Sequence, residues 1–143
     1  MFVSSIVASK GNKIVAARAE DSLAQVASRL AEHRIGAVLV YGPQGDIAGI
    51  ISERDIVRML AHEGAAALQR RVAEFMVTEV RTCEPEDTVD HVMEIMTQHR
   101  IRHLPVMQGG SVQAIISIGD VVKHLIDETR HEAEALKQYI AAG

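Results

Sequence analysis

The stretch Gly49-Ile50-Ile51-Ser52-Glu53-Arg54-Asp55-Ile56-Val57-Arg58 decides the fold, because its pattern returns later in the chain. Sixty-five positions downstream, Ile115-Ile116-Ser117 repeats the end of its apolar run, and Asp120 stands where Asp55 stands. An apolar run followed by Ser-x-x-Asp predicts a strand that leads directly into a capped helix. The chain therefore contains this strand-to-helix junction twice.

Upstream text repeats in the same order, with a shift of 66 positions. The matched pairs are Glu20–Leu23 with Glu86–Val89, His33–Ile35 with His99–Ile101, and Val40 with Val106. Ordered self-similarity at a constant shift is the signature of an internal duplication. We infer two copies of one unit, at about residues 14–62 and 80–127.

Each unit is expected to follow the order β-α-β-β-α, in an α+β fold. Apolar periodicity, Ser/Thr caps and Gly-rich turns predict the elements. They are extended pieces at 14–18 and 80–84, helices capped at Asp21-Ser22 and Asp87-Thr88, strands at 37–40, 47–51, 104–107 and 112–116, and second helices opening at Ser52 and Ser117. Neither unit can bury its apolar faces alone, so we expect the two repeats to pack sheet to sheet with pseudo-twofold symmetry.

The expected domain boundaries follow from these repeats. Residues 1–68 form the first repeat, with its core at 14–62, and residues 80–127 form the second. Residues 69–79 are a connector that begins with a short amphipathic helix at 69–76, and residues 128–143 are a helical extension.

Composition narrows the class of protein. The 143 residues are 48% hydrophobic but only 3% aromatic, so the core must be aliphatic. A net charge of −4 argues against a nucleic-acid partner, which needs a basic face. We read no membrane span and no signal peptide, and the single cysteine, Cys83, allows no internal disulfide. These features favour a cytoplasmic protein without a membrane partner.

Three stretches carry a resemblance to a known family. Gly49–Arg58 and His99–Val106 are similar to signature segments of CBS domains, named after cystathionine β-synthase, and Ala73–Thr78 is similar to the family's inter-repeat segment. The resemblance covers about residues 2–127 and occurs twice in register. The chain looks like a stand-alone tandem CBS pair.

The resemblance implies that adenosine ligands such as AMP, ADP, ATP, S-adenosylmethionine or NAD bind in clefts between the two repeats. In the family motif the Asp receives the ribose hydroxyls, and the residues that open the middle strand approach the phosphates. Carried over, the first site comprises Ser52, Asp55, Ile35, Gly36 and Ala37, and the second comprises Ser117, Asp120, Ile101, Arg102, His103, Leu104 and Pro105. The backbone near Val15 or Arg81 would border the adenine, and Arg54 would offset the repulsion of phosphate by Glu53.

The residue types fit this chemistry, but each also has a simpler interpretation. An ionised Asp can accept two vicinal hydroxyls, and Arg102 and His103 suit a phosphate. Ser-x-x-Asp is equally a helix cap, Arg54 and Glu53 can be a solvated pair, and His103 can be a packed histidine. Because Gly36-Ala37 bring no charge, the second site is expected to be the stronger one.

The expected function is that of a regulatory module that binds an adenine nucleotide (AMP, ATP or NAD) and uses no catalytic cofactor. The alternative is a structural or protein-interaction scaffold that binds no ligand. No nucleophile–base pair, carboxylate pair or metal-ligand spacing stands out, so we predict neither an enzyme nor a metal site. A target protein is a further candidate partner.

The second helix of the second repeat is expected to continue to the C-terminus. After Asp120 no Gly or Pro interrupts the chain until Gly143. One apolar stripe follows helical spacing, and it comprises Val122, Leu125, Ile126, Thr129, Ala133, Leu136 and Ile140. The excess stripe has no counterpart in the first repeat, so the sequence predicts a homodimer formed through this helix. The alternatives are that the helix folds back over the connector or frays in solvent.

Overall fold

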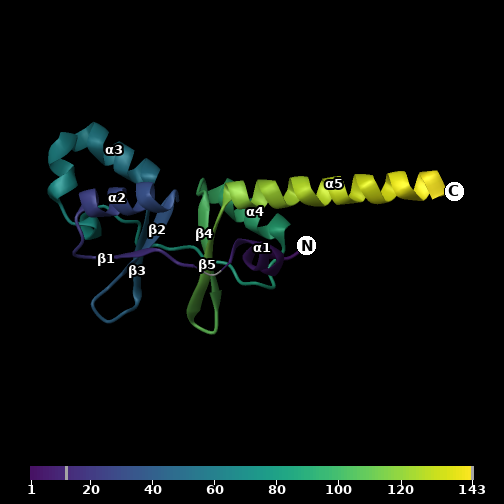
Figure 1. The fold of residues 1–143 in the computed structure, drawn as a ribbon. Helices are drawn as coiled ribbons and strands as arrows, with labels where there is room; N and C mark the ends of the chain where they lie inside the picture. The colour runs from purple at the N-terminus through teal and green to yellow at the C-terminus, as the bar shows by residue number, and fades with distance from the viewer. Residues whose placement is uncertain (12, 143) are drawn as a thin grey trace. The chain divides into compact units, whose positions relative to one another are not determined.

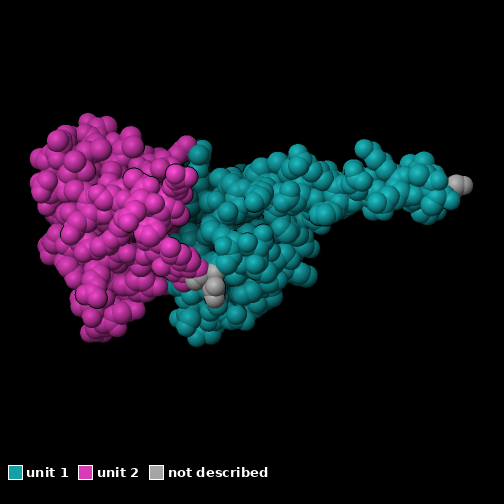
Figure 2. Space-filling view, viewed as in Figure 1, with its two compact units in different colours: residues 1–12, 82–143 teal, residues 13–81 magenta. Residues whose placement is uncertain are grey.

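The computed structural model describes residues 1–11 and 13–142. The chain divides into two compact units (Figure 2): unit 1 comprises residues 1–12 and 82–143, and unit 2 comprises residues 13–81. Both combine short β-strands with α-helices, so the predicted α+β class is confirmed.

Unit 2 contains the first repeat (Figure 1). Its elements are β1 (Ala16–Arg18), α2 (Leu23–His33), β2 (Ala37–Tyr41), β3 (Ile47–Ser52) and α3 (Glu53–Glu63). The sheet order is β1-β2-β3, in which β1 is parallel and β3 antiparallel to β2. The predicted order of strands and helices is therefore present in this repeat.

Unit 1 contains the second repeat, preceded by a helix from the N-terminus (Figure 1). Its elements are α1 (Val3–Lys10), α4 (Val89–His99), β4 (His103–Gln108), β5 (Ser111–Ser117) and α5 (Ile118–Ala142). The extended piece expected at 80–84 is reduced to one parallel bridge between Cys83 and Val106. The sheet of this repeat consequently has two named strands, β4 and β5.

Local capping explains where the paired helices α2 and α4 begin and end. The Ser22 side chain accepts a hydrogen bond from the Gln25 N–H, and Thr88 accepts one from His91 in the equivalent position. At the other end, Arg34 and Arg100 adopt the left-handed conformation, with φ of 55° and 53°. This conformation turns the chain out of the helix and toward the following strand.

Each unit has its own aliphatic core beneath its helices. In unit 2 the helices α2 and α3 cover the sheet, and the buried residues are Ala17, Leu23, Val26, Leu30, Val38, Val40, Ile51, Ile56, Ala67 and Val72. In unit 1 the corresponding residues are Val3, Ile6, Cys83, Val89, Val92, Met96, Leu104, Val106, Ile116 and Val121. Cys83 is thus a buried core residue, and burial raises the pKa of its thiol to about 12.

The segment that precedes each repeat in the sequence packs with the other repeat: the N-terminal segment packs with the second repeat, and the connector packs with the first. The backbone N–H of Val3, near the start of the chain, donates to the backbone carbonyl of Asp87 in the second repeat at 2.9 Å. The backbone N–H of Val72, in the connector, donates to the backbone carbonyl of Asp21 in the first repeat at 2.8 Å. Both valines are fully buried in the cores that they join. Residues 1–12 therefore belong with the second repeat, which differs from the expected boundary of the first repeat at 1–68.

The connector is not the amphipathic helix that we expected at 69–76. It consists of two short 3₁₀ helices, Gly64–Gln69 and Val72–Glu74. Between them Arg71 is extended, with φ −74° and ψ 142°, and forms a bridge to Ser22. The bridge from Arg71 to Ser22, at the start of α2, thus prevents one continuous helix over residues 69–76.

Gly49 lies where the connector passes closest to β3, and we expect its replacement by alanine to destabilise unit 2. A Cβ at this position would lie 2.7 Å from the Val77 carbonyl oxygen and 2.8 Å from the Met76 sulfur. Backbone must move to relieve such overlap, at a cost of about 1–3 kcal/mol. Urea denaturation should show a lower midpoint for Gly49→Ala. The matched control is Gly119→Ala on α5, where the new Cβ would make an ordinary 3.5 Å contact; an equal loss in both variants would contradict the explanation.

The helix α5 spans 25 residues, as predicted, and its second half lies apart from the other elements of unit 1 (Figure 1). Every residue from Thr129 to Ala142 is exposed. Across residues 1–11 and 13–142, no helix combines the length and apolarity needed to cross a bilayer.

Candidate functional site

The junction between β5 and α5 brings together four of the residues predicted for the second site. The Ser117 N–H donates to Asp120 Oδ2 at 2.8 Å, and the Asp120 N–H donates to Ser117 Oγ at 3.1 Å. His103 pairs with Ser117 across the sheet, and the Ile118 N–H donates to the Arg102 carbonyl at 2.9 Å. We call Arg102, His103, Ser117 and Asp120 the Asp120 cluster.

Lys10 completes this cluster, although the sequence did not indicate it. From the last turn of α1 its Nζ donates to Asp120 Oδ2 at 2.6 Å and to the Ile115 carbonyl at 2.6 Å. Partial burial raises the pKa of the Asp120 carboxyl, but the Lys10 ammonium and the Ser117 N–H outweigh it, so the pKa lies below its usual value. Asp120 is therefore ionised at neutral pH and already neutralised by a cation.

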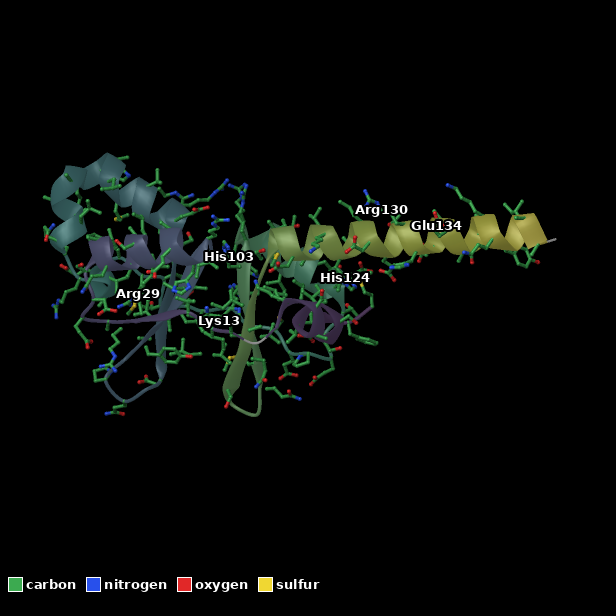
Figure 3. The ribbon with its side chains drawn as sticks, in the orientation of Figure 1. Lys13, Arg29, His103, His124, Arg130 and Glu134 are labelled. Carbon is green, nitrogen blue, oxygen red and sulfur yellow. The ribbon has the colours of Figure 1, made fainter. Side chains whose placement is uncertain are left out.

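The other residues predicted for the second site divide between surface and core. Arg102 is exposed, and His103 is half-buried at the start of β4 (Figure 3). Leu104 is fully buried in the core of unit 1, where its side chain packs beneath the helices. Ile101 also packs partly against this core, and the Pro105 carbonyl accepts the Cys83 N–H at 3.0 Å.

The equivalent junction in unit 2 brings together Asp55, Ser52, Ala37 and Gly36. Asp55 Oδ2 accepts hydrogen bonds from the Ser52 N–H and the Ser52 hydroxyl, both at 2.9 Å. Ala37 pairs with Ser52, and the Glu53 N–H donates to the Gly36 carbonyl at 2.9 Å. The predicted first-site residues are thus adjacent, and Asp55 forms a capping box as well.

The remaining predicted residues lie less centrally. Arg54 is exposed, as is Glu53 beside it. Val15 and Ile35 are partly buried against the core of unit 2. Arg81 is exposed and belongs to unit 2, outside the unit that holds Asp120.

Two surface cavities lie within unit 2. One of about 440 Å³ is lined in part by Ile35, Gly36 and Glu53, next to the Ser52–Asp55 junction. A larger one of about 750 Å³ lies at the opposite end of β2, where Arg18, Arg29 and Tyr41 line it. We favour the smaller cavity as part of a site because it adjoins the repeated motif.

Metal-binding chemistry finds no support in the described part of the chain. Within residues 1–11 and 13–142, no three His, Cys, Asp or Glu side chains lie close enough together to hold a metal ion. The junction in unit 1 offers the Asp120 carboxylate with the Lys10 ammonium, and the junction in unit 2 offers the Asp55 carboxylate with the exposed side chains of Glu53 and Arg54 nearby.

Comparison with known proteins adds an independent finding. The family model described as "CBS domain" matches residues 3–62 and 72–127. Among curated proteins, the chain is 35% identical over 128 residues to the CBS domain-containing protein CBSX3, mitochondrial, from Arabidopsis thaliana. That match covers 87% of this chain and 62% of the relative, so the chain spans less than two thirds of that protein's length.

Solved structures agree with the fold. The CBS-domain containing protein ATU1752 from Agrobacterium tumefaciens matches with a TM-score of 0.83 and 43% identity, over 85% of this chain and 91% of that one. The CBS domain pair of protein MJ0100, solved with 5′-methylthioadenosine and S-adenosyl-L-methionine, matches with a TM-score of 0.76 and 25% identity, over 87% of this chain and 99% of that one.

Proposed function

The chain belongs to the CBS domain family, and from that premise we propose that it is a regulatory module that binds an adenine nucleotide, AMP, ADP, ATP or an NAD-like ligand. The observation that carries the proposal is the Ser-x-x-Asp junction present in both units, with each Asp carboxylate held at the start of a helix. A carboxylate in this position can accept both hydroxyls of a ribose. The adenosine ligands of the MJ0100 pair support the same ligand class.

We expect the Asp120 cluster to be the stronger half of the binding machinery. Arg102, His103 and Lys10 bring basic groups to this junction, and cations attract phosphate. The junction in unit 2 offers Gly36 and Ala37 in place of the first two, and the carboxylate of Glu53. Unequal affinities, with the stronger site more sensitive to salt, follow from this difference.

A ligand-free scaffold is the competing function. It is favoured by the fact that Ser52 and Asp55 satisfy each other as a capping box without any ligand. Such a protein would use its folded surface for a partner protein and would not respond to nucleotides. Binding measurements distinguish the two functions directly.

Nucleotides that bind only the folded protein should raise its melting temperature. At a ligand concentration of 100 times the dissociation constant, stabilisation reaches about 2.7 kcal/mol. We therefore expect AMP, ATP or NAD to raise the melting temperature of the full chain. Calorimetric titration then gives the affinity of each ligand. Guanosine monophosphate is the control for a general phosphate effect. No shift with any adenine ligand at millimolar concentration would overturn the proposal in favour of the scaffold.

We further propose that the protein acts as a homodimer formed through α5. Val121 and Leu125 face the core of unit 1, whereas the neighbouring face of the helix is open. Its large apolar side chains are well exposed, at 48% for Ile126, 59% for Leu136 and 68% for Ile140. Leu125, which we expected in the apolar stripe, instead packs on its own unit.

The spacing along the open face is that of a coiled coil with a second copy of the chain. Alternating steps of four and three residues join Val122, Ile126, Thr129, Ala133, Leu136 and Ile140. Lys123, Arg130 and Lys137 flank this seam on one side, and Glu132 lies on the other (Figure 3 labels Arg130). A parallel pair places Glu132 near Lys137 of the partner subunit, whereas an antiparallel pair sets the basic flanks against each other. Charge complementarity therefore favours a parallel dimer.

A further inference from the structure

Lys10 marks a difference between the two junctions. In unit 2 the carbonyl of Ile50 accepts the backbone N–H of Val77 at 2.9 Å. In unit 1 the equivalent carbonyl, of Ile115, instead accepts the Lys10 ammonium at 2.6 Å. A neutral backbone donor can thus satisfy this position, yet unit 1 uses a charged side chain that also contacts Asp120.

Lys10 contacts the Asp120 carboxylate, the group that would accept the ribose hydroxyls in the proposed function. Lys10 Nζ lies 2.6 Å from Asp120 Oδ2, within strong hydrogen-bond distance, and the two side chains are 36% and 27% exposed. Ribose hydroxyls that approach this carboxylate must share it with the ammonium or displace it. An ammonium that gives up this carboxylate can form a new charge-assisted hydrogen bond if another anion lies nearby.

The substituent at the 5′ carbon of the ligand determines whether such an anion arrives. A 5′-phosphate supplies it, one ribose ring away from the hydroxyls. A methylthio group is neutral and forms no ion pair with the ammonium, and a sulfonium is positively charged and repels it. Lysine has a flexible four-carbon stem, so its ammonium can move from the carboxylate to the phosphate without movement of α1.

We infer that Lys10 is a specificity-determining residue, which selects adenosine ligands with a phosphate at the 5′ position over those with a neutral or cationic substituent. This inference rests on the proposed function. It adds the ligand class that the site in unit 1 prefers, and it makes the N-terminal helix part of the binding machinery. Lys10 acts by exchange of one anionic partner, Asp120, for another, the phosphate.

The test compares AMP with 5′-methylthioadenosine, two ligands that differ only at the 5′ position. Isothermal titration calorimetry on the full chain should show tighter binding of AMP to the wild type. In Lys10→Met, AMP should bind more weakly and 5′-methylthioadenosine more tightly, so that the ratio of the two affinities falls about tenfold, the value of one charge-assisted bond. Lys10→Arg keeps the cation and should retain the preference.

Further readouts separate selection from simple support of the fold. Because Lys10 also holds α1 to β5, melting temperatures and circular dichroism accompany each titration. The AMP preference of the wild type should shrink more steeply as salt rises than that of Lys10→Met, which keeps only Arg102 and His103 as basic groups near the phosphate. An unchanged affinity ratio in Lys10→Met, or a wild type that prefers 5′-methylthioadenosine, overturns this inference alone. Failure of both ligands to bind the wild type overturns the proposed function and this inference together.

Discussion

Replacement of Asp120 by alanine is expected to reduce the affinity for an adenine nucleotide by at least about tenfold, because each hydrogen bond to a charged group contributes about 1.5–3 kcal/mol. The carboxylate is held in place by the Ser117 N–H at 2.8 Å and is ionised beside Lys10, so it is ready to accept ribose hydroxyls. Its removal also leaves the Lys10 ammonium without its partner. Calorimetric titration of the purified variant measures the effect.

Asp87 provides a matched control for this substitution. It is another aspartate before a helix of unit 1, and its Oδ2 accepts the Glu84 N–H at 2.8 Å. Asp87→Ala should lose a comparable hydrogen bond to a backbone N–H three residues earlier but keep nucleotide affinity. Equal affinities for the wild type and Asp120→Ala, with both proteins folded by circular dichroism, would remove Asp120 from the site.

The double substitution Leu136→Asp/Ile140→Asp is expected to convert the dimer into a monomer. Both side chains lie on the open seam of α5, and the dimer would bury four of them. At about 1.5 kcal/mol for each buried side chain, the loss is about 6 kcal/mol, or roughly four orders of magnitude in the dissociation constant. Sedimentation equilibrium of the full chain measures this shift.

Gln138 supplies the control for added charge, since it lies on α5 outside the seam and is exposed. Gln138→Asp should remain dimeric, and deletion of residues 129–143 should reproduce the double substitution. Nucleotide affinity should persist in all three, because the Asp120 cluster lies at the other end of the helix. A monomeric wild type, or a double variant that dimerises as tightly as the wild type, would contradict the coiled coil.

Much of the fold could be read from the sequence because its signals are local. The Ser22 and Thr88 caps and the apolar runs of β2 to β5 each depend on residues a few positions apart. Duplication made every such signal appear twice, so the order of elements followed without tertiary information. The same locality identified Ser52–Asp55 and Ser117–Asp120 as junctions.

Tertiary contacts corrected the sequence where a local pattern competed with a distant partner. The connector has helical periodicity, but Arg71 takes an extended conformation because it pairs with Ser22. The Leu104 side chain packs in the core of unit 1 with Val3 and Val121, which come from distant parts of the chain. In both cases a partner far away in the chain outweighs the local preference.

By itself the sequence determined the two repeats, their α+β class, the strand-to-helix junctions with Asp55 and Asp120, and the uninterrupted helix α5. Only the tertiary structure decided that α1 joins the second repeat and that Lys10 reaches Asp120. Those two residues are 110 positions apart, and nothing in the text around Lys10 marks it. Lys10 reaches Asp120 because Val3 and Ile6 of the same helix are buried in the core of unit 1. That packing joins segments that are remote in the sequence, so no local pattern predicts it.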